Sequence, residues 1–439
     1  MGLAGADVAR ELAEAAQPGT VVAGPPAEAR SVAGVRPRFL VEPTTVTGVS
    51  RILALANARG LAVVPTGRGA RLGWGAPPRR LDVLLSLAKL DRVLAHEPAD
   101  LTLSVEGGAT LEALNATLGA HRQFLPLDPA HPELSTIGGL IATGAAGPYR
   151  ARYGTMRDLL LGLTVVRADG TVVKGGGRVV KNVSGYDIPK LHVGALGTLG
   201  VVVEAHLRLH ARPAEERSWV FGFRSAEAAL DAALEVRDTS IVASRCQILT
   251  AGALRALGES EPPDAALAVT IGSVPEAVHA QGARLADIVS RSGSAAIEVS
   301  DADAFWRRVA DLTWAEDPAR HLALRIGVRP SDTVKALRAV EAAQPAGATL
   351  RATIDVATGV LHAAATPIGG AQAVGLVTRV RAALTPLGAS CVIEHAPAEV
   401  LPTLDVWGDV GPALEPMRRL KGELDPAGVL NPGRFVGGI

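Results

Sequence analysis

The sequence has few of the residues that several functional classes require. Only two cysteines, Cys246 and Cys391, occur among its 439 residues. The chain therefore builds neither a disulfide framework nor an iron–sulfur site, which needs four thiolates. Aromatic residues make up 3% of the chain, and 44 basic residues balance 44 acidic ones. This balance argues against nucleic acid or an anionic membrane as a partner.

The sequence also lacks the signals of export and membrane insertion. No run of about 18 apolar residues is present, so we expect no transmembrane helix. Residues 1–16 carry acids in place of the basic start of a signal peptide and predict a short amphipathic helix. Together with the few cysteines, this predicts a cytoplasmic protein. The chain does have 48% hydrophobic and 20% charged residues, which is typical of a globular protein. Its 439 residues are enough for two or three domains.

Residues 135–212 are the most informative segment. Glycine-bearing turns are expected at 138–139, 144–147 and 197–200, among runs rich in β-formers. Glycine lets the main chain approach another group closely and adopt positive φ. Several such turns in one sheet-forming segment favour a main chain folded around a large, flat, phosphorylated ligand. A set of ordinary hairpin turns is the alternative.

Local signals place the helices and strands around this segment. Thr44 or Thr45 begins a helix that ends at Gly60, and Thr110 begins one that ends at Gly119. Asp169-Gly170 predicts a tight hairpin turn. Strands are expected at 61–65, 81–87, 101–106, 159–167, 171–174, 201–210, 266–271 and 322–328, and further helices at 226–236 and from 413.

The loop after the first of these strands contains the sequence Pro65-Thr66-Gly67-Arg68-Gly69-Ala70-Arg71. Its backbone N–H groups could form a nest for an anion, with two arginines nearby. No Gly-Lys-Ser/Thr follows, so it is not a P-loop, and the third glycine of the dinucleotide-binding fingerprint is missing. A flexible surface loop is the alternative for this motif alone.

Three segments together resemble the FAD-binding fold shared by vanillyl-alcohol oxidase and p-cresol methylhydroxylase. They are the loop at 65–75, residues 135–212 and the tail at 420–434. The motifs that carry the resemblance are Ser135-Thr136-Ile137-Gly138-Gly139, Tyr153-Gly154, Arg157-Asp158, Gly194-Ala195-Leu196-Gly197-Thr198-Leu199-Gly200 and Asn431-Pro432-Gly433-Arg434. They cover about 200 residues in the family's order.

The resemblance implies an α+β fold with a two-part FAD-binding domain of the p-cresol methylhydroxylase type. A second α+β domain, built on a ferredoxin-like antiparallel sheet, would cap the substrate. We expect an N-terminal helix and connector at 1–33, the FAD-binding domain at 34–212 and the cap domain at 213–395. Residues 396–439 would return to pack on the FAD-binding domain.

A narrower resemblance is to the FAD-binding E subunit of bacterial glycolate oxidase. It is carried by GPYR at 147–150, KNVSGYDIPKL at 181–191, ALRIGVRPSD at 323–332 and DPAGVLNPGR at 425–434. In that system a D subunit carries a second flavin and an F subunit carries iron–sulfur clusters. The resemblance therefore implies both as partners, and oxidation of a small 2-hydroxy acid as the function.

The resemblance also assigns cofactor residues. Gly67 and Gly69 would contact the pyrophosphate. Gly138, Gly139, Thr143 and Gly144 would lie against the flavin and ribityl chain, and Gly154 and Val201 near the adenine side or the pyrophosphate. Lys181 and Tyr186 would lie at the isoalloxazine edge, where a cation stabilises the reduced flavin. The full set of predicted cofactor residues is Pro65, Thr66, Gly67, Arg68, Gly69, Ala70, Arg71, Ser135, Thr136, Gly138, Gly139, Thr143, Gly144, Gly147, Tyr153, Gly154, Tyr186, Gly200, Val201 and Asn431.

One departure from the family bears on how the cofactor is held. Many relatives attach FAD covalently through a histidine in the pyrophosphate loop, but no histidine precedes His96 here, and both cysteines follow residue 240. We therefore expect non-covalent FAD, which acid denaturation releases into the supernatant.

The catalytic residues are expected in the cap domain. Oxidation of a 2-hydroxy acid needs a cation for the carboxylate and a base for the hydroxyl proton. Arg325 is the candidate for the first, His395 for the second, and Lys181 for the flavin edge. Related dehydrogenases resemble one another in a metal-like site, formed by an H-x-x-D-G-N-x-H stretch and a later E-H-G. This chain has only His362 for the first and Glu394-His395-Ala396 for the second. We predict no metal, and a site formed by His362, Glu394 and His395 is the alternative.

Three functions stay open from the sequence. The chain is an FAD subunit of a glycolate or related 2-hydroxyacid oxidase complex, a stand-alone flavin oxidoreductase acting on a hydroxyacid or polyol, or a non-catalytic FAD-binding subunit that stabilises a partner. In the first case the complex would be cytoplasmic or held at the inner face of the membrane through its partners.

Overall fold

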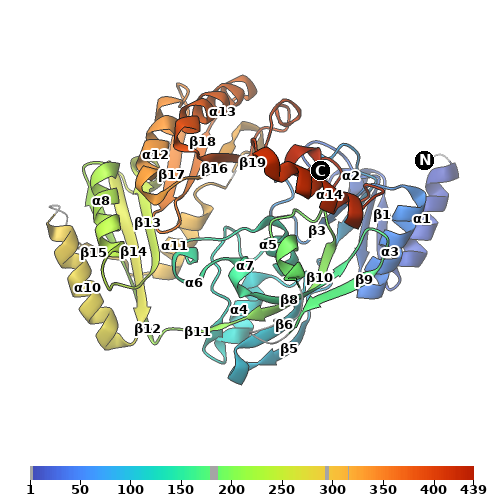
Figure 1. The fold of residues 1–439 in the computed structure, drawn as a ribbon, viewed down its shortest axis with the longest axis horizontal. Helices are drawn as coiled ribbons and strands as arrows, with labels where there is room; N and C mark the ends of the chain where they lie inside the picture. Colours follow the sequence, from blue (N-terminus) through green and yellow to red (C-terminus); the bar gives the residue numbers. More distant parts are fainter. Residues whose placement is uncertain (1–2, 178–185, 292–295, 315) are drawn as a thin grey trace.

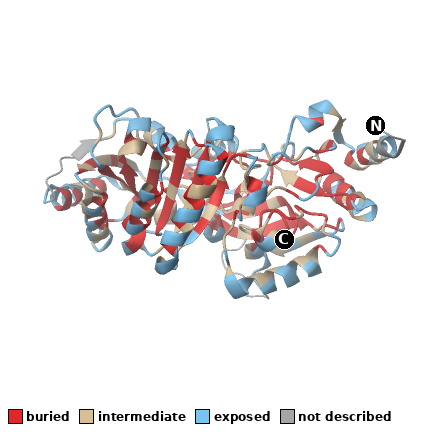
Figure 2. Cartoon of the chain, turned by 90° about the horizontal axis from the view of Figure 1, so that it is seen from above, coloured by how far each residue is buried: buried red, intermediate tan, exposed pale blue. Residues whose placement is uncertain are grey.

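The computed structural model describes residues 3–177, 186–291, 296–314 and 316–439 (Figure 1). It has two parts, which we call the first domain (34–212, with the N-terminal helix and the tail) and the cap domain (213–395). Figure 2 shows that buried residues concentrate in the strands of both parts, while the outer helices carry exposed residues. The predicted α+β fold class is confirmed. Among the described helices, none is long and apolar enough to cross a membrane.

The first domain begins with a four-stranded sheet in the order β1-β2-β4-β3. Its helices and strands are α1 (Leu3–Ala16), β1 (Gly19–Ala23), α2 (Pro25–Glu28), β2 (Phe39–Pro43), α3 (Val46–Arg59), β3 (Val63–Thr66) and β4 (Val83–Ser86). The predicted helix caps are confirmed, since the Thr45 side chain accepts from Gly48 N and Gly60 ends α3 in the left-handed region. Strand β1 lies inside the segment that was expected to be only a helix and connector. It is a partly exposed edge strand, so its hydrophobic pattern is weak.

The second sheet of the first domain is antiparallel, in the order β5-β6-β10-β8-β9. The predicted hairpin is confirmed, with Val165 opposite Val173. The turn expected at Gly138 and Gly139 is wrong. Both residues lie in helix α5, where the Thr136 side chain accepts a hydrogen bond from Gly139 N. The bounds are β5 (Val93–Glu97), β6 (Thr102–Glu106), α4 (Leu111–Gly119), β7 (Gln123–Phe124), α5 (Ile137–Thr143), α6 (Arg150–Tyr153), α7 (Met156–Leu159), β8 (Leu160–Val166), β9 (Val172–Gly176), β10 (Val201–Arg208) and β11 (His210–Ala211).

The cap domain is built on one eight-stranded antiparallel sheet, in the order β15-β12-β14-β13-β17-β18-β16-β19. Its strands are β12 (Glu215–Phe223), β13 (Ala243–Thr250), β14 (Ala265–Ser273), β15 (Ala296–Glu298), β16 (Leu322–Gly327), β17 (Thr349–Asp355), β18 (Val360–Thr366) and β19 (Ser390–His395). Its helices are α8 (Ala226–Arg237), α9 (Ala251–Ala256), α10 (Pro275–Ser290), α11 (Ala302–Asp311), α12 (Thr333–Ala342) and α13 (Gly370–Leu384).

This sheet consists of two halves with the same chain path. The first half runs β12-α8-β13-β14-α10-β15 and the second β16-α12-β17-β18-α13-β19, with the short α9 as an addition to the first. Each is a ferredoxin-like βαββαβ unit, and β13 pairs with β17 to join them. The sequence showed no internal repeat, because only the backbone plan is repeated.

The two faces of the cap sheet have different environments. Helices α8, α10, α12 and α13 pack on one face and bury the largest hydrophobic core of the molecule, which includes Phe221, Leu267 and Ile354. Alternate residues of the same strands point to the other face, toward the first domain. Polar residues with buried side chains occur there, among them Arg245, Gln247 and Asp355. The site described below lies on this second face.

The tail returns to the first domain (Figure 1). After α14 (Leu414–Leu424) the chain runs beside β3, where Val63 N donates to Val429 O and Asn431 N donates to Val63 O. Leu430 and Val429 are fully buried in the core between α1, α3 and the first sheet. The last residues are thus an integral part of the first domain.

Candidate cofactor groove and substrate cavity

A groove opens where the loop after β3, the start of α5 and the turn before β10 meet. We call it the glycine groove. Gly69 has φ of +85°, and no atom lies within 4 Å of where its Cβ would be, so its backbone faces open space. At Gly67 a Cβ would lie 2.1 Å from the Thr136 hydroxyl oxygen, so this loop can approach α5 only with glycine. The groove is lined by residues 65–72, Leu87, Gly107, 134–136, Gly138, Gly139, Ala142, Thr143, Leu196, Gly197, 200–202 and Arg434.

The chemistry of this groove suits a flat ligand with a diphosphate. The described residues that line it include three arginines, Arg68, Arg71 and Arg434, and no acidic residue. Thr136 and Thr143 have their hydroxyls committed to Gly139, which fixes the ends of α5. Loop backbone and small side chains therefore form the surface, with positive charge and no competing carboxylate. An FAD-like group fits these residues.

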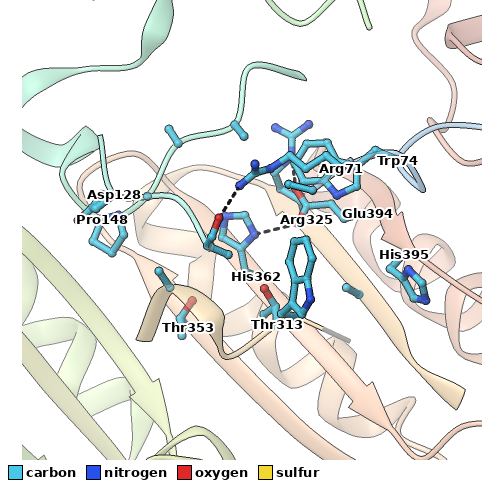
Figure 3. Close-up of a pocket in the computed structure, with 18 of the residues that line it drawn as sticks. Arg71, Trp74, Asp128, Pro148, Thr313, Arg325, Thr353, His362, Glu394 and His395 are labelled. Carbon is cyan, nitrogen blue, oxygen red and sulfur yellow. Dashed lines mark hydrogen bonds and ion pairs between the residues drawn. The ribbon is translucent and has the colours of Figure 1, made fainter. Parts of the chain in front are cut away.

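A second cavity of about 270 Å³ lies between the first domain and the second face of the cap sheet (Figure 3). We call it the interdomain cavity. The first domain contributes Arg71, Trp74 and Arg150, and the cap domain contributes residues from β16 to β19 and the α11 region. Arg71 lines both this cavity and the glycine groove, so the two spaces adjoin.

Glu394 is the centre of an ionic cluster in this cavity. Its carboxylate lies 3.1 Å from Arg325 Nε and 3.4 Å from His362 Nδ1, as the dashed lines of Figure 3 indicate. Burial acts to raise the pKa of Glu394, but His362, Arg325 and Arg71 together hold it below its ordinary value. Glu394 is therefore ionised at neutral pH. It neutralises part of the positive charge and attracts Arg325 as an ion pair, without a hydrogen bond between Nε and Oε1.

Arg71 is held by the first domain. Its guanidinium donates to Ser135 Oγ at 2.8 Å and to Ala130 O at 3.2 Å. Burial lowers its pKa to about 10, so it stays charged at neutral pH. Ser135 thus supports an arginine, and it also lines the glycine groove.

Arg150 and Asp355 face the same cavity from opposite domains. Burial raises the pKa of Asp355 and lowers that of Arg150. Asp128 also lines the cavity but is paired with Arg245. This leaves Arg71, Arg150 and Arg325 against Asp355 and Glu394 when the histidines of the cavity are neutral. This balance suits a ligand with one carboxylate.

His395 lies apart from the Glu394 cluster (Figure 3). Its Nε2 is 2.9 Å from the main-chain oxygen of Pro318. A carbonyl oxygen only accepts, so Nε2 carries the proton and Nδ1 keeps a free lone pair. Nδ1 points toward the loop at Gly73, on the first-domain side. The geometry therefore leaves His395 able to accept a proton from a ligand in the cavity.

The structure brings some predicted residues together and leaves others apart. Arg325 and His395 share the interdomain cavity, which also takes Gly144 and Gly147. Tyr153 lies in an aromatic cluster with Phe124 and Tyr149. Lys181 lies outside the described residues. The other predicted residues that do not line the groove are Tyr153, Gly154, Tyr186, which is 93% exposed, and Asn431, which is buried behind the groove.

Sequence reasoning missed several residues of the cavity. Arg150 stands in the GPYR motif, which was used only as a family marker, and Asp355 ends a strand without any motif of its own. Trp74 lies within the predicted loop at 65–75 but was not singled out. Glu394 was weighed only as a metal ligand, but in the structure Arg325 and His362 contact it. Within the described ranges, no three potential ligands converge on a metal position.

Comparisons with known proteins agree with this architecture. A family described as an FAD binding domain matches residues 37–176, and the C-terminal domain of FAD-linked oxidases matches residues 409–435. The predicted cofactor, FAD, and the predicted kind of binding domain are thereby confirmed.

The similar curated proteins act on hydroxy acids by name. Glycolate oxidase subunit GlcD of Bacillus subtilis is 31% identical over 214 residues, which is 48% of this chain and 45% of GlcD. D-2-hydroxyglutarate dehydrogenase of Xanthomonas citri pv. viticola is 39% identical over 177 residues, 40% of this chain and 38% of that protein. The chain thus spans less than half the length of these relatives. The E-subunit assignment stays a prediction.

Solved structures share the fold over almost the whole chain. p-Cresol methylhydroxylase superposes with a TM-score of 0.74 at 17% identity, covering 98% of this chain and 96% of its own. 4-Ethylphenol oxidase from Gulosibacter chungangensis gives 0.75 at 16% identity, with 98% and 96% covered. At these identities the likeness concerns the fold alone.

Proposed function

We propose that this chain, which carries an FAD-binding domain of the FAD-linked oxidases, is an oxidoreductase that acts on the CH–OH group of a small 2-hydroxy acid. One observation carries the proposal. Arg71 lines both the glycine groove and a cavity that also holds Arg325, Arg150 and His395. A carboxylate-binding cavity therefore adjoins the cofactor groove. The hydroxyacid relatives support the same substrate class.

The residues of the cavity have separate roles in this proposal. When bound, FAD supplies the electron acceptor that such an oxidation needs. Arg325, paired with Glu394, binds the substrate carboxylate. His395 accepts the hydroxyl proton at Nδ1, because its Nε2 is committed to Pro318 O. Trp74 and Trp314 supply apolar wall, which limits water around the ligand.

We further infer that the chain works as an E-type subunit of a glycolate oxidase complex. With two cysteines in the chain, both buried in the cap core, electrons leave it for a partner. A D-type flavin subunit and an F-type iron–sulfur subunit are the proposed partners, in the cytoplasm or at the inner face of the membrane. The alternatives are a stand-alone oxidoreductase and a non-catalytic FAD-binding subunit.

One anaerobic experiment separates these functions. The purified chain is loaded with FAD and mixed with glycolate or D-lactate, and the visible flavin absorbance is followed. Bleaching by the chain alone indicates an autonomous site. Bleaching only after addition of a D-type partner indicates the complex, and no bleaching in either case contradicts the proposed oxidation. Acid precipitation of the same sample tests non-covalent binding, because a pellet that keeps the flavin contradicts it.

A further inference from the structure

Arg434 is a buried cation whose described partners are all neutral. Arg434 is 3% exposed to solvent. Its guanidinium donates to the main-chain oxygens of Leu72, at 2.7 Å, and Trp74, and to Asn431 Oδ1 at 3.2 Å. Among the described residues no carboxylate forms an ion pair with it, and burial alone lowers its pKa, to about 10. The group is therefore a charged guanidinium at neutral pH.

This arrangement resembles that of Arg71, whose hydrogen-bond acceptors are also neutral, and differs from that of two other buried cations, Arg245 and Lys421. Arg245 Nε lies 2.8 Å from Asp128, and Lys421 Nζ lies 2.5 Å from Asp425. Buried charges are normally paired, because an isolated charge in a low-dielectric interior loses its hydration without compensation. Arg434 thus has the surroundings of a charge whose counter-ion comes from outside the chain.

The position of Arg434 indicates what that counter-ion is. Its acceptors, the main-chain oxygens of Leu72 and Trp74, belong to the loop after β3. Leu72 and Arg434 both line the glycine groove. The groove contains no acidic residue among the described ones. Its neighbour Asn431 donates to the main-chain oxygen of Leu196, which also lines the groove. The tail therefore contacts two of the segments that form the groove.

We propose that Arg434 is the buried counter-charge of the cofactor's diphosphate. It fixes the pyrophosphate loop through neutral main-chain oxygens, and its own charge stays available to the anion in the groove. Arg68, which lies on the same groove with a side chain 44% exposed and 4.0 Å from Asp91, is screened by water and by that carboxylate. The inference rests on FAD binding alone and is independent of hydroxyacid oxidation.

The test separates charge from loop support. Arg434→Gln keeps hydrogen-bond donors and removes the charge, Arg434→Lys keeps the charge with fewer donors, and Arg419→Gln on the exposed face of α14 is the matched control. FAD affinity is measured by titration of the full chain, and thermal shifts are measured with ADP and with riboflavin, which has no phosphate. We expect Arg434→Gln to weaken FAD binding roughly 10- to 100-fold and to abolish the ADP shift. The riboflavin shift stays, and Arg434→Lys retains most of the affinity.

Three results would overturn the proposal. Equal loss of affinity in the Gln and Lys variants, with ADP and riboflavin affected alike, assigns Arg434 to loop support only. A lower melting temperature with unchanged FAD affinity leads to the same conclusion. Where a variant without FAD does not fold, the rate of flavin loss from the loaded protein on dilution, at low and high salt, gives the same ranking. A Gln variant that keeps the salt dependence of the native chain contradicts the charge role.

Discussion

The two halves of the cap sheet follow the same βαββαβ path and present different chemistry to the first domain. The first half binds it directly. Arg245 on β13 forms an ion pair with Asp128 at 2.8 Å, and its guanidinium lies 3.6 Å from the centre of the Tyr149 ring. The second half lines the interdomain cavity with Arg325, Asp355 and Glu394. One backbone plan thus serves as an anchor in one half and as a binding surface in the other.

The two halves differ in how far their arginines are buried and paired. Arg245 is 4% exposed, and both Asp128 and Glu216 lie within ion-pair distance of it. Such a closed network fixes the relative position of the domains. Arg325 has a side chain that is 36% exposed and a single carboxylate partner, Glu394. It therefore retains capacity for a ligand, and the rigid half holds the cavity in place around it.

The largest expected effect is on the anchoring half. Arg245→Met leaves the carboxylate of Asp128 buried without its partner, so the free energy of unfolding should fall by about 3–5 kcal/mol. Chemical denaturation measures this loss. Arg325→Met in the second half is the matched variant and should cost less than about 1 kcal/mol. Equal losses of unfolding free energy in the two variants would contradict the proposed difference between the halves. Adding Asp128→Asn to Arg245→Met should restore part of the stability.

The second effect is on catalysis and concerns the other half. Arg325→Met should lower kcat/KM for the hydroxy acid about 100-fold, equivalent to about 3 kcal/mol, because the carboxylate loses its charge-assisted bonds. Arg325→Lys should raise KM more than it lowers kcat. Bound FAD should be unchanged in both variants. Arg237→Gln, at the end of α8 and outside the cavity, is the control from the first half, and a loss as large there would contradict the assignment.

Acid should destabilise the native protein through a buried histidine next to the second half of the cap sheet. His321, next to β16, is 2% exposed, and burial lowers its pKa from 6.5 to about 4. Between these values the unfolded chain binds more protons than the native one, so stability falls as pH is lowered through this window. At about pH 5, His321→Gln should recover up to about 2 kcal/mol of this loss. Denaturation curves at pH 7 and pH 5 measure it. His192→Gln in the first domain is the comparison, since burial also lowers that pKa to about 4.

The smallest effect concerns the two thiols, one in each half. Burial raises the pKa of Cys246 on β13 to about 12 and also raises that of Cys391 on β19. Neither should react with iodoacetamide in the native protein. In increasing urea, mass spectrometry of the labelled peptides should detect Cys391 first. Earlier labelling of Cys246 would mean that the anchoring half opens before the other.

Local signals in the sequence were sufficient for much of the first domain. Thr45, Thr110 and the Asp169-Gly170 turn act on their immediate neighbours, so the elements they bound could be predicted. The glycine groove was also predictable, because Gly69 is required by its own positive φ and Gly67 by its close approach to α5.

The interdomain cavity could not be predicted in this way. Arg150 and Asp355 come from different domains and meet only through the packing of the cap sheet on the first domain. Nothing in the residues near either one signals the other. Tyr153 shows the opposite error, since a motif placed it at the cofactor while its ring packs against other aromatic rings. The duplicated plan of the cap sheet was hidden because it survives in hydrogen bonding and not in residue identity.

The contact between Arg434 and the Leu72 main chain has a consequence for biosynthesis. The two residues are separated by 362 positions, and the entire cap domain is translated between them. The wall of the groove is therefore completed only after the cap sheet has left the ribosome. Flavin loading must follow translation of this segment, and products that stop before residue 429 should be colourless. The yellow colour of a preparation would then report that the tail has been made and docked.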